Sequence, residues 1–147
     1  MAARSLIIAT HNTHKTEEIR EMLGDYFDEI HDLTAFPEIP EAVEDGTTFS
    51  ENAAIKAISA SICELESLVL ADDSGLEIDA LDRAPGVYSA RYSGPDATDE
   101  SNRKKALAEL KKVGAKGKDR SGRFRCARLR HEVRRLRVDI EPVPRWR

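Results

Sequence analysis

A run of apolar residues that leads directly into two acids constrains this chain more than any other feature. Residues 68–81 read LVLADDSGLEIDAL, so a segment typical of a buried strand leads into Asp72 and Asp73. Two adjacent carboxylates at the end of a buried strand repel each other and lose hydration, which costs free energy. A hard divalent cation such as Mg2+ would offset that cost, because carboxylate and phosphate oxygens are its preferred ligands. A strand-end turn is the alternative, since Asp, Ser and Gly favour turns, and the pair alone leaves both open.

Strand and helix patterns alternate along the chain. Strand-like runs occupy residues 5–9, 28–33 and 67–71, while residues 75–81 alternate and either extend or pair with the last run. Helical spacing occupies residues 16–24, 47–65 and 98–114. The alternation predicts an α/β sheet domain.

Two of the expected helices have clear local signals. Thr48 with Glu51 fits a capping box at the start of the helix over residues 47–65. We expect its apolar face to consist of Ala54, Ile55, Ile58 and Ile62. The helix over residues 98–114 begins with Thr98 as its cap and ends at Gly114.

Charge is distributed unevenly along the chain. Residues 1–119 contain 13 Lys and Arg against 24 Asp and Glu, whereas residues 120–147 contain 10 Arg against 3 acidic residues. No apolar run approaches the roughly 18 residues that a membrane span needs, and the short apolar start is not that of an exported protein. Cys63 and Cys126 show no metal-type spacing, and two cysteines form no disulfide framework, so we expect a reducing cytoplasm.

Three groups of polar residues are candidates for chemistry. The strand–loop–helix around residues 10–15 (THNTHK) offers the N–H groups of a helix start and the cation of Lys15, although, taken alone, a capped helix start with an exposed Lys explains it better. Lys56 shares a helix face with Asn52, and Glu44 precedes that helix in an acidic loop. His11 and His14 have no third ligand nearby, so we do not expect zinc. Together with the paired aspartates, these groups are what metal-assisted nucleotide hydrolysis needs.

The order of four motifs resembles a known family. ATHNTHK, TFSENAAIKA, ADDSGLEIDAL and APGVYSARYSG occur in that order and are followed by ATDESNRKKALAEL. This pattern is similar to the inosine/xanthosine triphosphate pyrophosphatases, and it fits them better than the Maf-type nucleotide pyrophosphatases. The resemblance implies a twisted mixed β-sheet flanked by helices. It also implies hydrolysis of ITP, dITP and XTP to the monophosphate and pyrophosphate, which cleanses the nucleotide pool.

The resemblance also implies roles for individual residues. The triphosphate would be bound by Thr10, His11, Asn12, Thr13, His14 and Lys15. Lys56 would neutralise phosphate charge, and Ser74 would contact the substrate. Glu44 and Asp73 would bind Mg2+, and Asp73 would also accept the proton of the attacking water. The family is usually homodimeric, and the role of Asp72 stays open.

The resemblance ends at about residue 127, after RFRCA. The later strand, FGYD-type segment and HR motif of the family are absent from residues 128–147. We therefore divide the chain into the N-terminal portion of a pyrophosphatase domain (residues 1–127) and an Arg-rich tail outside the family pattern (residues 128–147). The expected fold is thus incomplete at its C-terminus, and an out-of-frame origin would explain the Arg excess.

Two other functions are possible for a chain with this tail. A catalytically impaired nucleotide-binding fragment would keep part of the phosphate and metal site but lack the base pocket. A nucleic-acid binder would use the basic amphipathic pattern that places Leu129, Val133, Leu136 and Ile140 at helical spacing. We prefer a tail that packs poorly or is partly disordered, and we expect neither nucleic acid nor a membrane as a partner.

Overall fold

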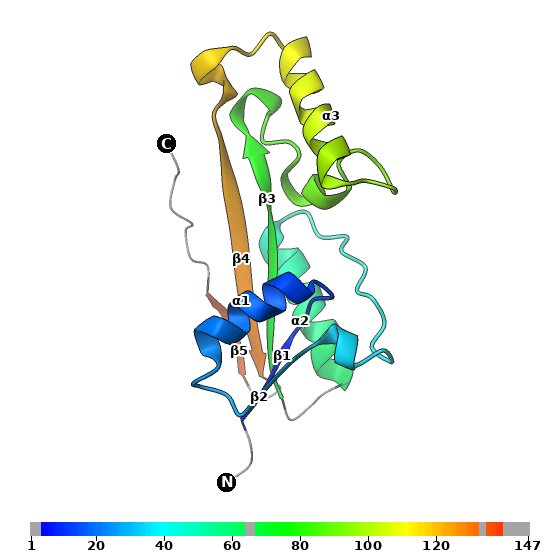
Figure 1. Ribbon diagram of the computed structural model, residues 1–147, viewed down its shortest axis with the longest axis vertical. Coiled ribbons are helices and arrows are strands. Elements are labelled where there is room, and N and C mark those ends of the chain that lie inside the picture. The colour runs from blue at the N-terminus through cyan, green and yellow to red at the C-terminus, as the bar shows by residue number, and fades with distance from the viewer. Residues whose placement is uncertain (1–3, 64–66, 133–134, 140–147) are drawn as a thin grey trace. The chain divides into compact units, whose positions relative to one another are not determined.

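The chain divides into two compact units. The computed structural model describes residues 4–63, 67–132 and 135–139. The first unit contains the described residues up to Asp72 and those from Ala127 onward, and the second contains Asp73–Cys126. The helices are α1 (Thr13–Leu23), α2 (Phe49–Cys63) and α3 (Asp99–Lys112) (Figure 1). The strands are β1 (Ser5–Ile8), β2 (Glu29–Asp32), β3 (Leu68–Ile78), β4 (Gly122–Glu132) and β5 (Arg135–Asp139).

The strand order is β2-β1-β3-β4-β5, which confirms the expected mixed sheet. β1 pairs in parallel with β2, where Ile7 lies opposite His31, and with β3, where Ile7 lies opposite Val69. β4 pairs in antiparallel with β5. Because parallel neighbours require crossover connections, α1 lies between β1 and β2 in the chain, and α2 lies between β2 and β3.

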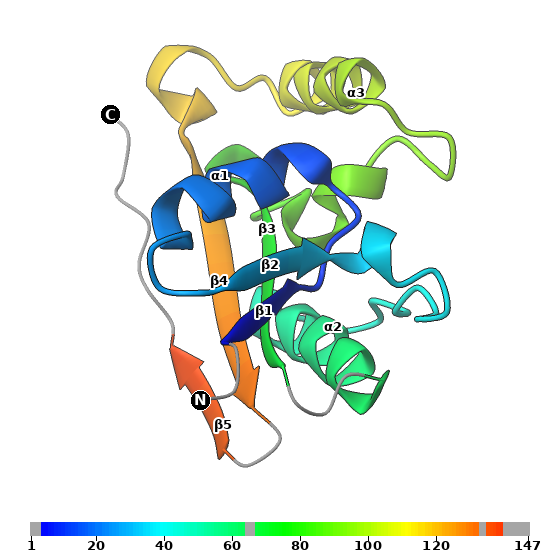
Figure 2. The same cartoon turned by 60° about the horizontal axis from the view of Figure 1, so that its bottom comes forward.

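In the first unit, helices cover both faces of the sheet. Ile7 and Val69 face one cluster, which includes Ala53, Ala57 and Ala60 of α2. Their neighbours along the strands, Leu6, Ile8 and Leu70, face a second cluster, which includes Ile19 and Leu23 of α1. Figure 2 shows α1 and α2 on opposite sides of β1. The strands of this layer therefore carry apolar residues on both faces, as parallel strands between two helices must.

The buried face of α2 differs from our expectation. Ala53, Ala57 and Ala60 are at most 1% exposed, whereas Ile58 and Ile62 are 44% and 68% exposed. The predicted core face was wrong for Ile58 and Ile62, whereas Ala54 packs against the first cluster and Ile55 is half-buried. The sequence offers two apolar faces, and the one with the smaller side chains packs against the sheet. The capping box is confirmed: the Thr48 hydroxyl accepts from the N–H of Glu51, and the Glu51 carboxylate accepts from the N–H of Thr48.

β3 continues through the two aspartates. It runs unbroken to Ile78, so the strand-end turn is wrong and residues 75–78 extend the same strand. β1 ends earlier, at Ile8. The next residue, Ala9, still donates its N–H to the carbonyl of Leu70 in β3. Asp72 and Asp73 thus lie where β3 extends past the carboxyl end of its parallel neighbour.

The region after residue 127 does not form the helix whose spacing we considered. Its described residues lie in β4 and β5, and Leu129 is 2% exposed within the same cluster as Ile7. The helical interpretation was wrong because the pattern here has period two: Ala127 and Leu129 are buried, and Arg128 and Arg130 are exposed. Poor packing is also wrong for Leu129. Val133 and Ile140 lie outside the described residues.

The second unit has its own core. Ile78, Ala106, Leu110 and Ala115 form a buried cluster. Thr98 caps α3 by accepting from the N–H of Ser101, as we expected, and Gly114 follows the helix with a φ of 73°. Among the described residues, no helix combines the length and the hydropathy that crossing a bilayer requires.

Asp32 at the end of β2 ties α1 to the sheet. Its side chain accepts a 2.6 Å hydrogen bond from the Thr16 hydroxyl and further bonds from the N–H and hydroxyl of Thr34. Burial acts to raise the pKa of Asp32, but these hydrogen bonds and the nearby Arg20 outweigh it, so the pKa lies below its usual value of 3.8. The ionised carboxylate therefore contributes to stability.

We predict that Asp32→Asn lowers the free energy of unfolding by about 1–3 kcal/mol, because a buried hydrogen-bond acceptor for Thr16 is lost. The depressed pKa means that the contribution is complete above the unfolded value of 3.8 and is lost as the pH falls below it. Urea unfolding from pH 6 to pH 2.5 should therefore show a smaller acid loss for Asp32→Asn than for the wild type. The exposed Asp25→Asn is the control, and an equal acid loss in all three proteins would contradict the prediction.

Candidate functional site

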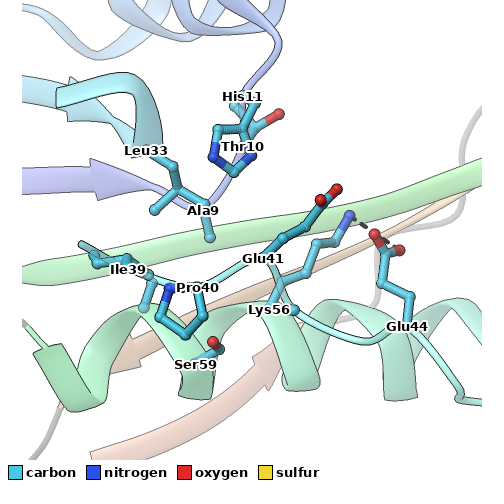
Figure 3. A pocket seen from close by; sticks show the side chains of 12 residues that line it. Ala9, Thr10, His11, Leu33, Ile39, Pro40, Glu41, Glu44, Lys56 and Ser59 are labelled. Atoms are coloured by element: carbon cyan, nitrogen blue, oxygen red, sulfur yellow. Dashed lines mark ion pairs between the residues drawn. The ribbon is translucent and has the colours of Figure 1, made fainter. Parts of the chain in front are cut away.

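A cavity of about 190 Å³ lies in the first unit, between the carboxyl end of β1 and α2. Its floor is apolar and includes Ala9, Leu33 and Ile39. Its polar side chains come from three segments and are Thr10, His11, Glu41, Glu44, Lys56 and Ser59 (Figure 3). The carboxyl end of a parallel strand is the usual place for a ligand in an α/β sheet, because helices begin there and loops converge.

Lys56 and Glu44 form an ion pair at this cavity. Lys56 Nζ lies 3.5 Å from Glu44 Oε2, and the two side chains are 18% and 32% exposed (Figure 3). α2 packs against the sheet through Ala53 and Ala57. The adjoining face of the helix carries Lys56 and borders the cavity. A cation and a carboxylate therefore meet beside an apolar floor, an arrangement that can bind phosphate oxygens and a metal ion together.

The start of α1 uses some of the groups that we expected to be available. Asn12 caps the helix, and its Oδ1 accepts from the N–H groups of His14 at 3.0 Å and Lys15 at 3.3 Å. The Thr10 hydroxyl accepts in turn from the N–H of Asn12 at 3.1 Å. Asn12, Thr13 and His14 are exposed. In this state the cap therefore occupies two of the donors that would otherwise face an anion.

Lys15 lies at a different cavity from Lys56. Its Nζ lies 2.9 Å from Asp72 Oδ1, and the two side chains are 29% and 15% exposed. Both residues line a second cavity of about 170 Å³, whose other members include Ile19, Leu70 and the exposed Arg128. Alternation along β3 explains the pairing, because Leu70 faces the α1 side of the sheet and Asp72 follows it two residues later.

The remaining predicted residues, Asp73 and Ser74, follow Asp72 within β3 and are half-buried. They belong to the second unit. Since successive strand residues point to opposite faces, we expect the side chain of Asp73 to point away from that of Asp72. Within the described part of the chain, no three His, Cys, Asp or Glu residues are grouped so as to hold a metal ion.

The structure therefore divides the predicted site residues. Thr10, His11, Glu44 and Lys56 surround the first cavity, while Lys15 lies with Asp72 at the second. Sequence analysis missed Ser59 and Glu41 in the first cavity. Ser59 lies three positions after Lys56, so helical spacing could have indicated it, whereas nothing in the loop sequence distinguishes Glu41 from its acidic neighbours.

Comparison with known proteins identifies related sequences. The Ham1 family model matches residues 6–135, which is beyond the end of the motif resemblance at about residue 127. The chain is 50% identical over 122 residues to a dITP/XTP pyrophosphatase of Exiguobacterium sp., covering 83% of this chain and 60% of that protein. It is 52% identical over 122 residues to a dITP/XTP pyrophosphatase of Desulfotalea psychrophila, covering 82% of this chain and 52% of that protein.

Solved structures agree with this relationship. A HAM1 protein from Coxiella burnetii has a TM-score of 0.77 at 40% identity, covering 88% of this chain and 64% of that one. The Staphylococcus aureus Ham1 protein has a TM-score of 0.78 at 31% identity, covering 93% and 67%. The chain spans about half the length of the curated relatives that it matches, from 36% to 60%.

We predict that Lys15 and Asp72 stabilise the fold as a coupled pair. In a double-mutant cycle with Lys15→Met and Asp72→Asn, urea unfolding should give a coupling free energy of about 1 kcal/mol, because both charges are partly removed from water. The exposed pair Glu100–Lys104, whose side chains are 68% and 75% exposed, is the matched control and should couple by only about 0.3 kcal/mol. Equal coupling in the two pairs would contradict the prediction.

Proposed function

Because this chain belongs to the Ham1 family, we propose that it hydrolyses the non-standard purine nucleoside triphosphates ITP, dITP and XTP to the monophosphate and pyrophosphate. Relatives named dITP/XTP pyrophosphatases at about 50% identity support this substrate class. The single structural observation that carries the proposal is the Lys56–Glu44 pair beside a cavity at the carboxyl end of β1. In such a pair, Lys56 would contact the phosphate oxygens and Glu44 would bind the metal ion that accompanies them.

The donor set suits Mg2+ rather than a metal held entirely by protein. Mg2+ is usually bound by one or two carboxylates, with phosphate oxygens and water completing its octahedron. Glu44 and Asp73 would supply these two carboxylates. We propose that these two residues hold the ion. When bound, Mg2+ supplies neutralisation of phosphate charge.

In the proposed reaction the other residues bind, orient and move a proton. Asp73 accepts a proton from a water molecule as the water oxygen forms a bond to phosphorus and the bond to the bridging oxygen breaks. Lys56 lies against the departing charge, and Ser74 contacts the substrate. Thr10, His11 and the first turn of α1, with Asn12, Thr13, His14 and Lys15, bind the triphosphate. For Lys15 this requires an exchange of partner, because its ammonium group contacts Asp72 in the unliganded chain.

A nucleotide-binding fragment with little catalytic power is the second candidate. The observation that favours it is that the predicted phosphate-binding residues divide between two cavities, with Lys56 at the first and Lys15 at the second. Such a fragment would bind Mg2+ and a triphosphate at Glu44 and Lys56 but discriminate poorly between bases. We do not propose nucleic-acid binding, because the described part of the Arg-rich region forms sheet strands rather than a basic amphipathic helix.

We further propose a homodimer working in the cytoplasm. Cys63 and Cys126 are thiols rather than a disulfide, which suits a reducing compartment. The large exposed side chains of Ile58 and Ile62 on α2 give the first unit apolar surface that a partner copy would bury. Sedimentation of the purified chain tests the assembly, and a monomer at all concentrations would contradict it.

We predict that purified protein releases pyrophosphate from ITP with Mg2+, and that Asp73→Asn lowers kcat by about 100- to 10,000-fold because the proton acceptor is lost. A coupled pyrophosphate assay measures the rate, and addition of EDTA should abolish it. Asp96→Asn, an exposed aspartate in the same unit, is the matched control and should retain full activity.

The outcomes separate the two candidates. Pyrophosphate release that survives Asp73→Asn would remove Asp73 from its proposed role. A folded wild type that binds ITP with Mg2+ in calorimetry but releases no pyrophosphate would support the fragment. Equal rates with ITP and ATP would contradict selectivity for non-standard purines.

A further inference from the structure

We propose that Asn52 is a positioning residue, which acts through the loop before α2 to hold Glu44 beside Lys56. The inference rests on the proposed function, because it assigns Asn52 to the residue pair that would bind Mg2+ and phosphate. Asn52 does not line the first cavity, and its printed hydrogen bond is to the backbone of the loop before α2. Its effect passes through the backbone of residues 44–48.

The first observation is a buried contact between Asn52 and this loop. Asn52 is fully buried, and its Oδ1 accepts a 2.8 Å hydrogen bond from the N–H of Gly46, two residues after Glu44. The loop passes so close that a Cβ on Gly46 would lie 2.6 Å from Asn52 Oδ1 and 2.8 Å from the Cβ of Glu51. A glycine is therefore required for this approach, and the contact fixes where the loop meets the helix.

The second observation is that the next two residues are held as well. Glu51 Oε2 accepts from the N–H of Thr47 at 2.6 Å, from its hydroxyl at 2.9 Å and from the N–H of Thr48 at 3.2 Å. These hydrogen bonds hold the pKa of Glu51 below its usual value, so the carboxylate is ionised at neutral pH. Side chains of the first turn of α2 thus bind three consecutive backbone N–H groups of the loop.

Helix geometry links these contacts to the site. Asn52 and Lys56 are four residues apart, so they lie one turn from each other on the same face of α2. The loop held at Asn52 therefore passes beside the turn that carries Lys56, and Glu44 reaches Lys56 Nζ at 3.5 Å. A capping role alone would be met by Thr48 and Glu51 at the exposed start of the helix. It gives no reason for a buried amide side chain that contacts the loop.

The test compares Asn52→Ala with the wild type in two measurements. Amide hydrogen exchange of Gly46 should become faster by at least tenfold, because its N–H loses its acceptor. The Mg2+ concentration for half-maximal pyrophosphate release should rise by about 10- to 100-fold, the usual effect of removing a group that orients a metal ligand. The value of kcat at saturating Mg2+ should change less, since Asp73 and Lys56 are intact.

Two further variants keep the result interpretable. Gly46→Ala leaves Asn52 in place but displaces the loop, and should raise the Mg2+ requirement similarly. Ile30→Val, a core change in β2 away from the loop, controls for lost stability and should leave the Mg2+ requirement unchanged. In a Glu44→Gln background, Asn52→Ala should have no further effect on the Mg2+ requirement.

The broadening of NMR signals by Mn2+ near Glu44 separates the two proposals, because it requires no turnover. If the wild type binds Mn2+ but releases no pyrophosphate, and Asn52→Ala weakens the binding tenfold, the inference stands and the proposed hydrolysis fails. If the wild type is active and Asn52→Ala matches Ile30→Val in its Mg2+ requirement, the inference fails and the hydrolysis stands. If the wild type shows neither Mn2+ broadening at Glu44 nor pyrophosphate release, both are overturned.

Discussion

The ion pair between Lys15 and Asp72 resolves the main electrostatic problem of this fold. β3 continues past the end of β1 and carries two adjacent aspartates into a half-buried position. A carboxylate that is largely removed from water needs a partner, and the first turn of α1 supplies the ammonium group of Lys15 at 2.9 Å. The contact therefore joins two neighbouring parts of the first unit, the start of the first crossover helix and the point where the parallel strand pair ends.

Small side chains on α2 have an equally direct consequence for the first cavity. Because Ala53, Ala57 and Ala60 form its buried face, the helix approaches β1 and β3 closely, and the adjoining face with Lys56 borders the loop before it. The same close approach leaves Ile58 and Ile62 exposed. The alanine face of α2 thus determines both how the helix packs on the sheet and which face, with Lys56, borders the cavity.

The two lysines that suit a triphosphate are each paired with a carboxylate, but in different surroundings. Lys56 meets Glu44 beside an apolar floor at the carboxyl end of β1, whereas Lys15 meets Asp72 on the α1 side of the sheet. A bound phosphate chain would have to compete with both carboxylates. A metal ion bound at Glu44 would lessen that competition at Lys56. The proposed cofactor would then release the ammonium group of Lys56 from Glu44 as well as neutralise phosphate charge.

Local chemistry made several features readable from the sequence alone. The alternation of strands and helices, the Thr48–Glu51 capping box, the Thr98 cap and the family motifs all depend on residues a few positions apart. The tertiary structure alone decided which face of α2 is buried, how far β3 extends and where Lys15 points. The contact between Lys15 and Asp72 joins residues 57 positions apart, and two apolar faces of one helix are equivalent until a sheet packs against one. Such choices depend on distant partners, and no local pattern encodes them.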